Sequence, residues 1–184
     1  MTPFNVLEPI PRQTIISADK EYRYTLWRNW SDQLFDKPKA GYVNWIMLNP
    51  STADATNDDP TIRRCIGFTK ALGFSELCVT NLFAYRATAP DELRRVADPV
   101  GILNDKYLVE MAFGAALRVC AWGSLGSERA REVLALFEGK HIDNLTCLGL
   151  TKQGEPKHPL YVHASTVFSL YFRKKPVDNP CAAC

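Results

Sequence analysis

Polar side chains follow several predicted strands of this 184-residue chain, at the point where each strand ends. The first is Asn49, which with Pro50 closes the apolar run 42–48 and is followed by Ser51 and Thr52. Because proline cannot donate a hydrogen bond to a neighbouring strand, the strand must stop at about Asn49. Amide and hydroxyl groups in this position can bind a ligand by hydrogen bonds or orient a water molecule.

Two later strand ends carry similar groups. Asn81 closes the apolar run 77–81, and the loop after it contains Tyr85 and Arg86. His158 precedes a proline, as Asn49 does, and proline favours an extended backbone at the residue before it. The candidate catalytic residues are therefore Asn49 and His158, and the candidate substrate-binding residues are Ser51, Thr52, Asn81, Tyr85, Arg86 and Lys157.

Four short apolar segments alternate with helix signals along the chain; they are 42–48, 77–81, 118–122 and 145–150. Between the first two, Asp59 and Pro60 form the cap and first turn of a helix that ends near Gly73. Two more helices are predicted over 98–113 and 127–137. This alternation favours an α/β fold, a three-layer sandwich with a mainly parallel central sheet of about four strands. The carboxyl ends of such strands share one edge, so we expect the candidate residues to meet there.

Residues 15–30 predict an N-terminal edge strand or hairpin, because tyrosine and leucine alternate with other side chains over 22–27. The length suits one domain, expected over 1–172, and the basic segment 173–184 is expected to form a C-terminal tail.

The bulk composition is that of an ordinary globular protein, with 46% hydrophobic residues, 23% charged residues and a net charge of +2. That charge gives no general sign of a nucleic-acid binder. No apolar run approaches the length of a membrane span, so no membrane partner is expected. The first residues lack a secretory signal pattern, and the cysteine spacings form no metal-ligand set. We expect a cytoplasmic protein with reduced cysteines and no cofactor.

Several blocks of the chain resemble a bacterial and phage family that is catalogued only as a domain of unknown function. The most distinctive is Met-Leu-Asn-Pro-Ser-Thr-Ala-Asp at 47–54, and the others are 57–61, 81–86 and 157–161. This resemblance spans about 22–161 and implies a shared fold, but it gives no activity.

The same blocks are more distantly similar to the uracil-DNA glycosylase superfamily, whose first motif is a strand ending in Asp-Pro or Asn-Pro. Asn49–Pro50 matches the Asn form, Asn81 matches an asparagine that reads the base edge, and His158–Pro159 matches the start of the last motif. Two positions depart from the pattern. Ser51 replaces the usual Gly or Tyr, and Leu160 replaces the usual Ser.

This similarity implies an enzyme that hydrolyses the N-glycosidic bond of a modified base in DNA or in a nucleotide. Asn81 would read the base, His158 would donate to the base as it becomes anionic, and Asn49 would orient a water molecule. The expected partner is a nucleotide or nucleic acid. The remaining groups would hold the sugar or phosphates, or stack on the base: Ser51, Thr52, Arg86 and Lys157, and Tyr85.

Two other functions fit the same residues. Asp54, Asp58 and Asp59 could bind magnesium in an enzyme that acts on nucleotide phosphates. Ser51 and Leu160, which depart from the glycosylase pattern, instead favour a module that binds a nucleotide or nucleic acid without turning it over.

Overall fold

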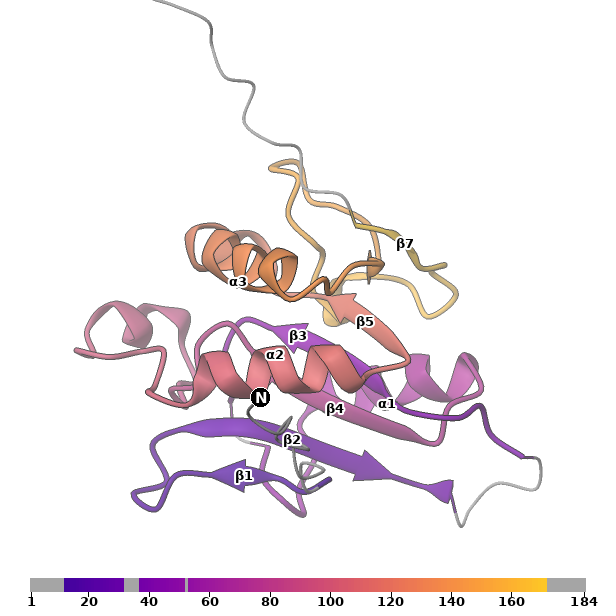
Figure 1. Ribbon diagram of the computed structural model, residues 1–184, viewed down its shortest axis with the longest axis horizontal. Helices are drawn as coiled ribbons and strands as arrows, with labels where there is room; N and C mark the ends of the chain where they lie inside the picture. Colours follow the sequence, from indigo (N-terminus) through magenta and orange to yellow (C-terminus); the bar gives the residue numbers. More distant parts are fainter. Residues whose placement is uncertain (1–11, 32–36, 52, 172–184) are drawn as a thin grey trace, which may run out of the picture.

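The computed structural model describes residues 12–31, 37–51 and 53–171. Over this part of the chain the fold is α/β, with a mixed seven-stranded sheet and three α-helices (Figure 1). The predicted sheet of about four mainly parallel strands is therefore smaller than the one observed. The expected tail, 173–184, lies outside the described residues.

The sheet has the strand order β1-β2-β4-β3-β5-β6-β7. Its members are β1 Ile15–Ile16, β2 Arg23–Asn29, β3 Val43–Met47, β4 Glu76–Asn81, β5 Leu117–Cys120, β6 Leu145–Cys147 and β7 Ser169–Leu170. The four central strands, β4, β3, β5 and β6, run parallel. The N-terminal pair β1–β2 adds to one edge, where β2 runs antiparallel to β4, and β7 runs antiparallel to β6 at the other edge.

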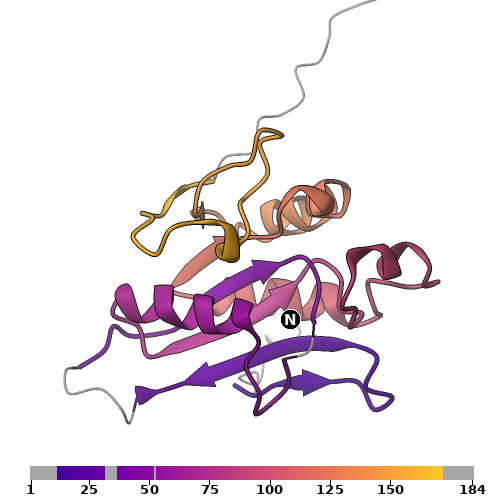
Figure 2. The same cartoon turned by 180° about the vertical axis from the view of Figure 1, so that it is seen from behind.

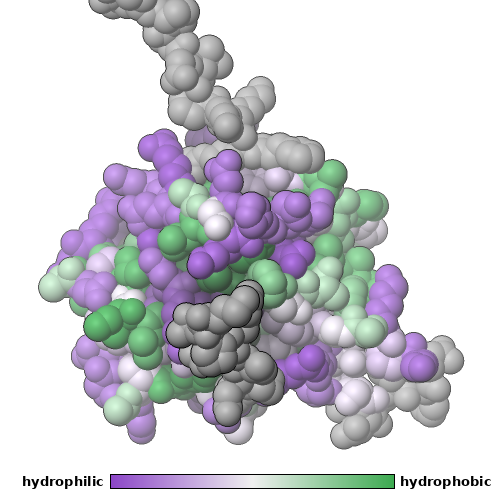
Figure 3. All heavy atoms as spheres, in the orientation of Figure 1, coloured by the Kyte–Doolittle hydropathy of each residue, from purple (hydrophilic) through white to green (hydrophobic). Residues whose placement is uncertain are grey.

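Three helices cover the sheet: α1 Pro60–Ala71, α2 Asn104–Gly114 and α3 Ser127–Gly139. Figures 1 and 2 show α1 on one face and the other two on the opposite face. The outer surface of α3 is mainly hydrophilic (Figure 3), while Ala130, Val133 and Phe137 face the core. Among the described helices, none has the length and apolar character of a membrane span.

The start of α2 differs from the predicted start at residue 98. The carboxylate of Asp98 accepts hydrogen bonds from the amides of Val100 and Gly101, both at 3.0 Å, and so closes a turn. Gly101 then has a φ of +82°, a left-handed conformation that interrupts a helix. The helix therefore begins only at Asn104.

Both faces of β3 are buried, which explains its uninterrupted apolar sequence. Val43, Trp45 and Met47 belong to the hydrophobic cluster that includes α1, whereas Ile46 packs in the cluster with α2 and α3. The indole Nε1 of Trp45 donates to Thr69 Oγ1 of α1 at 3.0 Å. Successive side chains of β3 therefore pack against helices on opposite faces of the sheet.

The connections after the neighbouring strands β3 and β5 leave toward opposite faces of the sheet. The chain runs from β3 into α1 on one face, and from β5 into α3 on the other (Figures 1 and 2). Such a divergence opens a crevice at the carboxyl ends of the strands, which is the usual ligand site of open α/β sheets.

The four cysteines of the described residues, Cys65, Cys78, Cys120 and Cys147, are buried and not disulfide-bonded. Burial raises the pKa of the Cys65, Cys78 and Cys120 thiols far above the ordinary value. We therefore expect a thiol reagent at neutral pH to leave these four unlabelled in the native protein and to label all of them after denaturation without reductant. Peptide mapping would separate them from Cys181 and Cys184. Labelling of any buried cysteine in the native protein would contradict this packing.

Candidate functional site

A cavity of about 430 Å³ lies at the carboxyl ends of the parallel strands. Its wall receives residues from all four connections: Asn49 and Ser51 after β3, Asn81 at the end of β4, Trp122 after β5, and His158 after β6. The structure thus brings four of the candidate residues together around one space. In the sequence these side chains stand at separate strand ends, and the parallel arrangement of the strands makes those ends neighbours.

Asn81 is the most unusual polar group of this cavity. The residue is 1% exposed, and neither atom of its side-chain amide has a hydrogen-bond partner within the described chain. Asn104 fixes the adjoining backbone, since its Nδ2 donates to the carbonyls of Asn81 and Leu82, both at 3.0 Å. A buried amide without partners costs about 1–3 kcal/mol, so the site is suited to a ligand that supplies both a donor and an acceptor.

Asn49 is held in one orientation by its own amide. Nδ2 donates to the carbonyl of Pro50 at 3.0 Å and to that of Ala87 at 2.8 Å. Both donors of the side chain are therefore used, and its Oδ1 is left without a donor among the described residues. An acceptor fixed in this way can orient a water molecule, but an amide cannot take up its proton at neutral pH.

His158 precedes a short 3₁₀ turn, Pro159–Tyr161, and its Nδ1 accepts from the amide of Leu160 at 3.3 Å. Because Nδ1 is the acceptor, the neutral ring carries its proton on Nε2. Burial lowers the pKa of His158 below its ordinary value of 6.5, and the nearby Asp59 carboxylate opposes this shift only partly. At neutral pH the ring is therefore a neutral donor.

Contacts with α1 hold the turn that carries His158. The guanidinium of Arg64 donates from Nε to the carbonyl of Pro159 at 3.3 Å, and from Nη2 to the carbonyl of Val162. The loop after β6 is thereby tied to the helix that follows β3.

Two charged residues that were not among the candidate catalytic or substrate-binding residues also line the cavity. Arg23, at the start of β2, is 2% exposed and donates from Nη1 to the carbonyl of Ala53 at 2.6 Å. Its Nε is buried without a partner, and no carboxylate of the described chain forms an ion pair with it. Burial lowers the pKa of Arg23 to about 10, so the group stays charged at neutral pH.

The other charged residue is Asp59. Its Oδ1 accepts from the amide of Ile62 at 2.8 Å, as the predicted helix cap requires, while the residue also lines the cavity. No partner of its Oδ2 lies within the described chain. This carboxylate is electrostatically coupled to Arg23 and to His158. The sequence indicated Asp59 only as a helix cap and a candidate magnesium ligand. For Arg23, the available signal was a charged residue between the tyrosines of 22–27.

The aromatic wall differs from the one expected. Trp122 is 2% exposed, and its Nε1 donates to Glu155 Oε2 at 2.8 Å. Tyr161 is 82% exposed, and its ring centroid lies 5.6 Å from that of His158. Both line the cavity. Tyr85 does not, because its backbone forms a bridge with Tyr22 and its ring packs edge-on against the Tyr22 ring at 5.8 Å.

The remaining predicted residues lie elsewhere. The backbone amide of Arg86 donates to the carbonyl of Glu21 at 2.8 Å, and its Nη1 donates to the carbonyl of Lys20 at 3.2 Å. Arg86 lines a separate hollow together with Asp54. Lys157 is exposed and does not line the cavity. Its backbone amide donates to the carbonyl of Gly149 at 2.9 Å. Thr52 lies outside the described residues.

The three aspartates considered for magnesium are engaged separately. The amides of Thr56 and Asn57 hydrogen-bond to the Asp54 carboxylate and hold its pKa far below the ordinary value. Asp58 forms an ion pair with Arg28 Nε at 2.6 Å, and Asp59 caps α1. Among the described residues, no three histidine, cysteine, aspartate or glutamate side chains come together as a metal-binding group.

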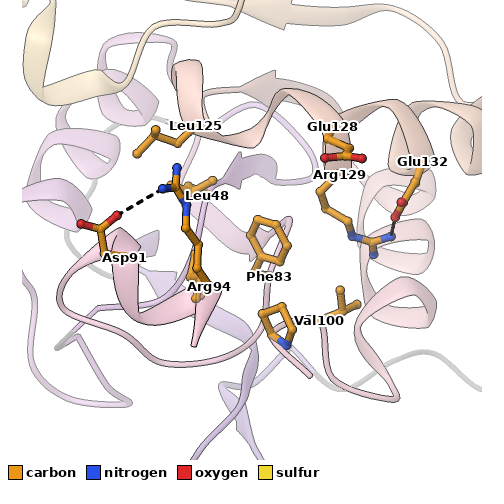
Figure 4. Close-up of a pocket in the computed structure, with 11 residues that line it drawn as sticks. Leu48, Phe83, Asp91, Arg94, Val100, Leu125, Glu128, Arg129 and Glu132 are labelled. Carbon is orange, nitrogen blue, oxygen red and sulfur yellow. Dashed lines mark hydrogen bonds and ion pairs between the residues drawn. The ribbon is translucent and has the colours of Figure 1, made fainter. Parts of the chain in front are cut away.

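A second hollow of about 420 Å³ adjoins the cavity, because Leu48 and Leu125 line both (Figure 4). Phe83 lies in this second hollow, between Arg94 and Val100 in the view. The charged groups of this hollow are paired with one another in two places, Arg94 with Asp91 at 3.9 Å and Arg129 with Glu132 at 2.7 Å.

The fold and the cavity together define an α/β domain with a polar cavity at the carboxyl edge of its parallel strands. The chain belongs to the family described as "Protein of unknown function (DUF1643)", whose sequence model matches residues 23–160. No curated protein and no solved structure matches the chain.

Proposed function

We propose that the cavity binds a nucleobase and that the protein hydrolyses the N-glycosidic bond of a modified base in DNA or in a nucleotide. The observation that carries the proposal is the buried Asn81 amide, whose donor and acceptor both lack partners. A base edge offers donors and acceptors side by side, and reading it by hydrogen bonds is how enzymes select a base taken out of the stack. Trp122 and Tyr161 supply aromatic surface for the base.

The departing base is served by His158. Cleavage leaves the electron pair of the C1′–N bond on the base, which therefore gains negative charge. The Nε2–H of neutral His158 donates to that charge. The distant resemblance of the His-Pro and Asn-Pro motifs to those of uracil-DNA glycosylases supports this assignment, because His158 and Asn49 line the same cavity.

The sugar side is served by Asn49 and Asp59. Asn49 Oδ1 orients a water molecule, whose oxygen bonds to C1′. The carboxylate of Asp59 accepts the proton that this water loses, a task an amide cannot perform. The departing base takes one proton from solvent and Asp59 returns its proton to solvent, so that the net reaction adds one water across the glycosidic bond.

Incubation of the protein with oligonucleotides that contain uracil, hypoxanthine or an alkylated base tests the proposal, with released base measured by chromatography. Free-base release from at least one of them is the expected result. Hydrolysis of nucleotides only in the presence of magnesium would replace it with the phosphate-directed alternative. Binding of nucleotides with no turnover would replace it with the binding module.

Asn81→Asp should change which base is accepted. The substitution keeps the size of the side chain, removes its N–H donors and adds a negative charge in a position that is 1% exposed. We expect the rate at which the preferred base is released to fall about ten- to a hundredfold, the scale of one buried group left unpaired. Release rates across the same panel of oligonucleotides measure this effect. Asn144→Asp, at an exposed position, serves as the control. An unchanged base preference in Asn81→Asp would show that Asn81 does not recognise the base.

A further inference from the structure

The guanidinium of Arg23 has one free edge. Nη1 is occupied by the carbonyl of Ala53 at 2.6 Å, whereas Nε is buried without a partner and Nη2 has none among the described residues. The hydrogens on Nε and Nη2 point the same way, as two parallel donors of fixed spacing. Such a fork matches two adjacent acceptor atoms of a ligand.

A buried, charged group with an empty donor is costly unless a ligand fills it. Arg23 is 2% exposed and Asn81 is 1% exposed, and both line the cavity. The backbone amide of Arg23 donates to the carbonyl of Ala84 at 2.9 Å, which ties it to the segment directly after Asn81. The free fork and the free amide therefore belong to two buried residues that line the same cavity.

We propose that the base read in this cavity is a 6-oxopurine, such as hypoxanthine or guanine, with Arg23 paired to its O6 and N7. This inference rests on the proposed function, since it names the substrate class of the same site. O6 and N7 are adjacent acceptors, and an arginine fork on them is the commonest specific contact between a side chain and a base. The neighbouring N1–H then meets the Oδ1 of Asn81.

The other bases match this donor pattern less well. Uracil and thymine carry two carbonyls separated by an N–H, and adenine presents an amino donor beside N7. Cytosine offers adjacent acceptors at O2 and N3, but O2 lies next to the glycosidic nitrogen. A recessed arginine on that edge would draw the sugar into the cavity wall. A phosphate also matches the fork, but the Asp59 carboxylate in the same cavity repels an anion.

The charge of Arg23 also serves the hydrolysis. As the bond between C1′ and N9 breaks, its electron pair spreads over the purine toward N7 and O6. A cation already held against these atoms stabilises that charge without rearrangement. Water supplies the oxygen on C1′, and the released purine takes one proton from solvent, as in the reaction proposed above.

Calorimetric titration of the full chain with hypoxanthine, 7-deazahypoxanthine, uracil, cytosine and inorganic phosphate tests the inference. Hypoxanthine should bind at least tenfold more tightly than its 7-deaza analogue, which lacks only the N7 acceptor. This comparison uses the wild-type protein and so does not depend on the folding of a variant. Equal affinity for the two, or tighter binding of uracil, cytosine or phosphate, would overturn the assignment.

Arg23→Lys keeps the charge and removes the fork. We expect it to weaken hypoxanthine binding about ten- to a hundredfold, the value of one bidentate contact, and to remove the preference over the 7-deaza analogue. Arg118→Lys is the matched control, because Arg118 is a half-buried arginine that donates to the carbonyl of Ala112 at 2.6 Å and does not line the cavity. A preserved preference in Arg23→Lys would also overturn the inference.

The two proposals fail separately. Purine binding without base release from any oligonucleotide would retain the 6-oxopurine ligand and reject the hydrolase. Release of uracil without any binding of hypoxanthine would retain the hydrolase and reject the role of Arg23.

Discussion

Asp59→Asn should lower the rate of base release by about a hundred- to ten-thousandfold, the usual contribution of a general base. Asparagine caps helices as well as aspartate does, so the hydrogen bond to the amide of Ile62 is kept and α1 should remain folded. Single-turnover release from the preferred oligonucleotide measures the effect, and calorimetry should show that base binding is nearly unchanged. A lower rate of base release with unchanged base binding would show that Asp59 acts in catalysis and not only in the packing of the site.

Asp58→Asn is the matched control for this variant. Asp58 is the neighbouring carboxylate, but it pairs with Arg28 at 2.6 Å and does not line the cavity. It therefore tests whether loss of any negative charge before α1 slows the reaction. Equal rates for Asp59→Asn and the wild type would leave Asn49 as the group that handles the water, and the carboxylate would have no part in the chemistry.

His158→Ala should slow base release by about ten- to a thousandfold, the scale of a lost donor to a developing anion. The affinity for the intact oligonucleotide should change less, because the negative charge on the base develops only as the bond breaks. His163→Ala provides the control, since His163 is exposed, does not line the cavity and contacts Ser165 at 2.8 Å. A parallel loss of rate and binding would instead assign His158 to holding the loop.

The lowered pKa of His158 also gives this variant a signature in stability. As pH falls below 6.5, the unfolded chain takes up the proton before the folded protein does. The folded state therefore loses stability from about 6.5 down to the lower pKa of the folded protein. Chemical denaturation at a series of pH values should show this loss in the wild type and a smaller one in His158→Ala. An identical pH dependence would mean that the ring is not buried as a neutral group.

Local sequence rules were sufficient for the elements next to the site. The run 42–48 has the composition of a doubly buried strand, and Asp59 with Pro60 predicts the start of α1. Because parallel strands align their carboxyl ends, the position of Asn49, Asn81 and His158 around one cavity followed from the strand–helix alternation. The roles of these residues stay predictions.

Pairing between strands that are far apart in the sequence could not be predicted by those rules. Nothing in the sequence of β2 indicates that it lies antiparallel beside β4, and this pairing is what brings Arg23 to the cavity. The same limit applies to Tyr85, since its bridge to Tyr22 joins residues far apart in the chain. Asp59 was expected only as a helix cap or a magnesium ligand. Its place in the cavity was missed because one of its oxygens caps the helix and the other does not.

The cavity is complete only when the N-terminal hairpin is docked on the edge of the sheet. The strands that carry Asn49, Asn81 and His158 come from one stretch of chain, whereas Arg23 arrives only when β2 docks on the edge of β4. Opening of that edge would remove a cation from the cavity and expose the backbone of β4, without unfolding the parallel strands. A ligand that contacts Arg23 would therefore close this edge and slow hydrogen exchange at the amides of β2.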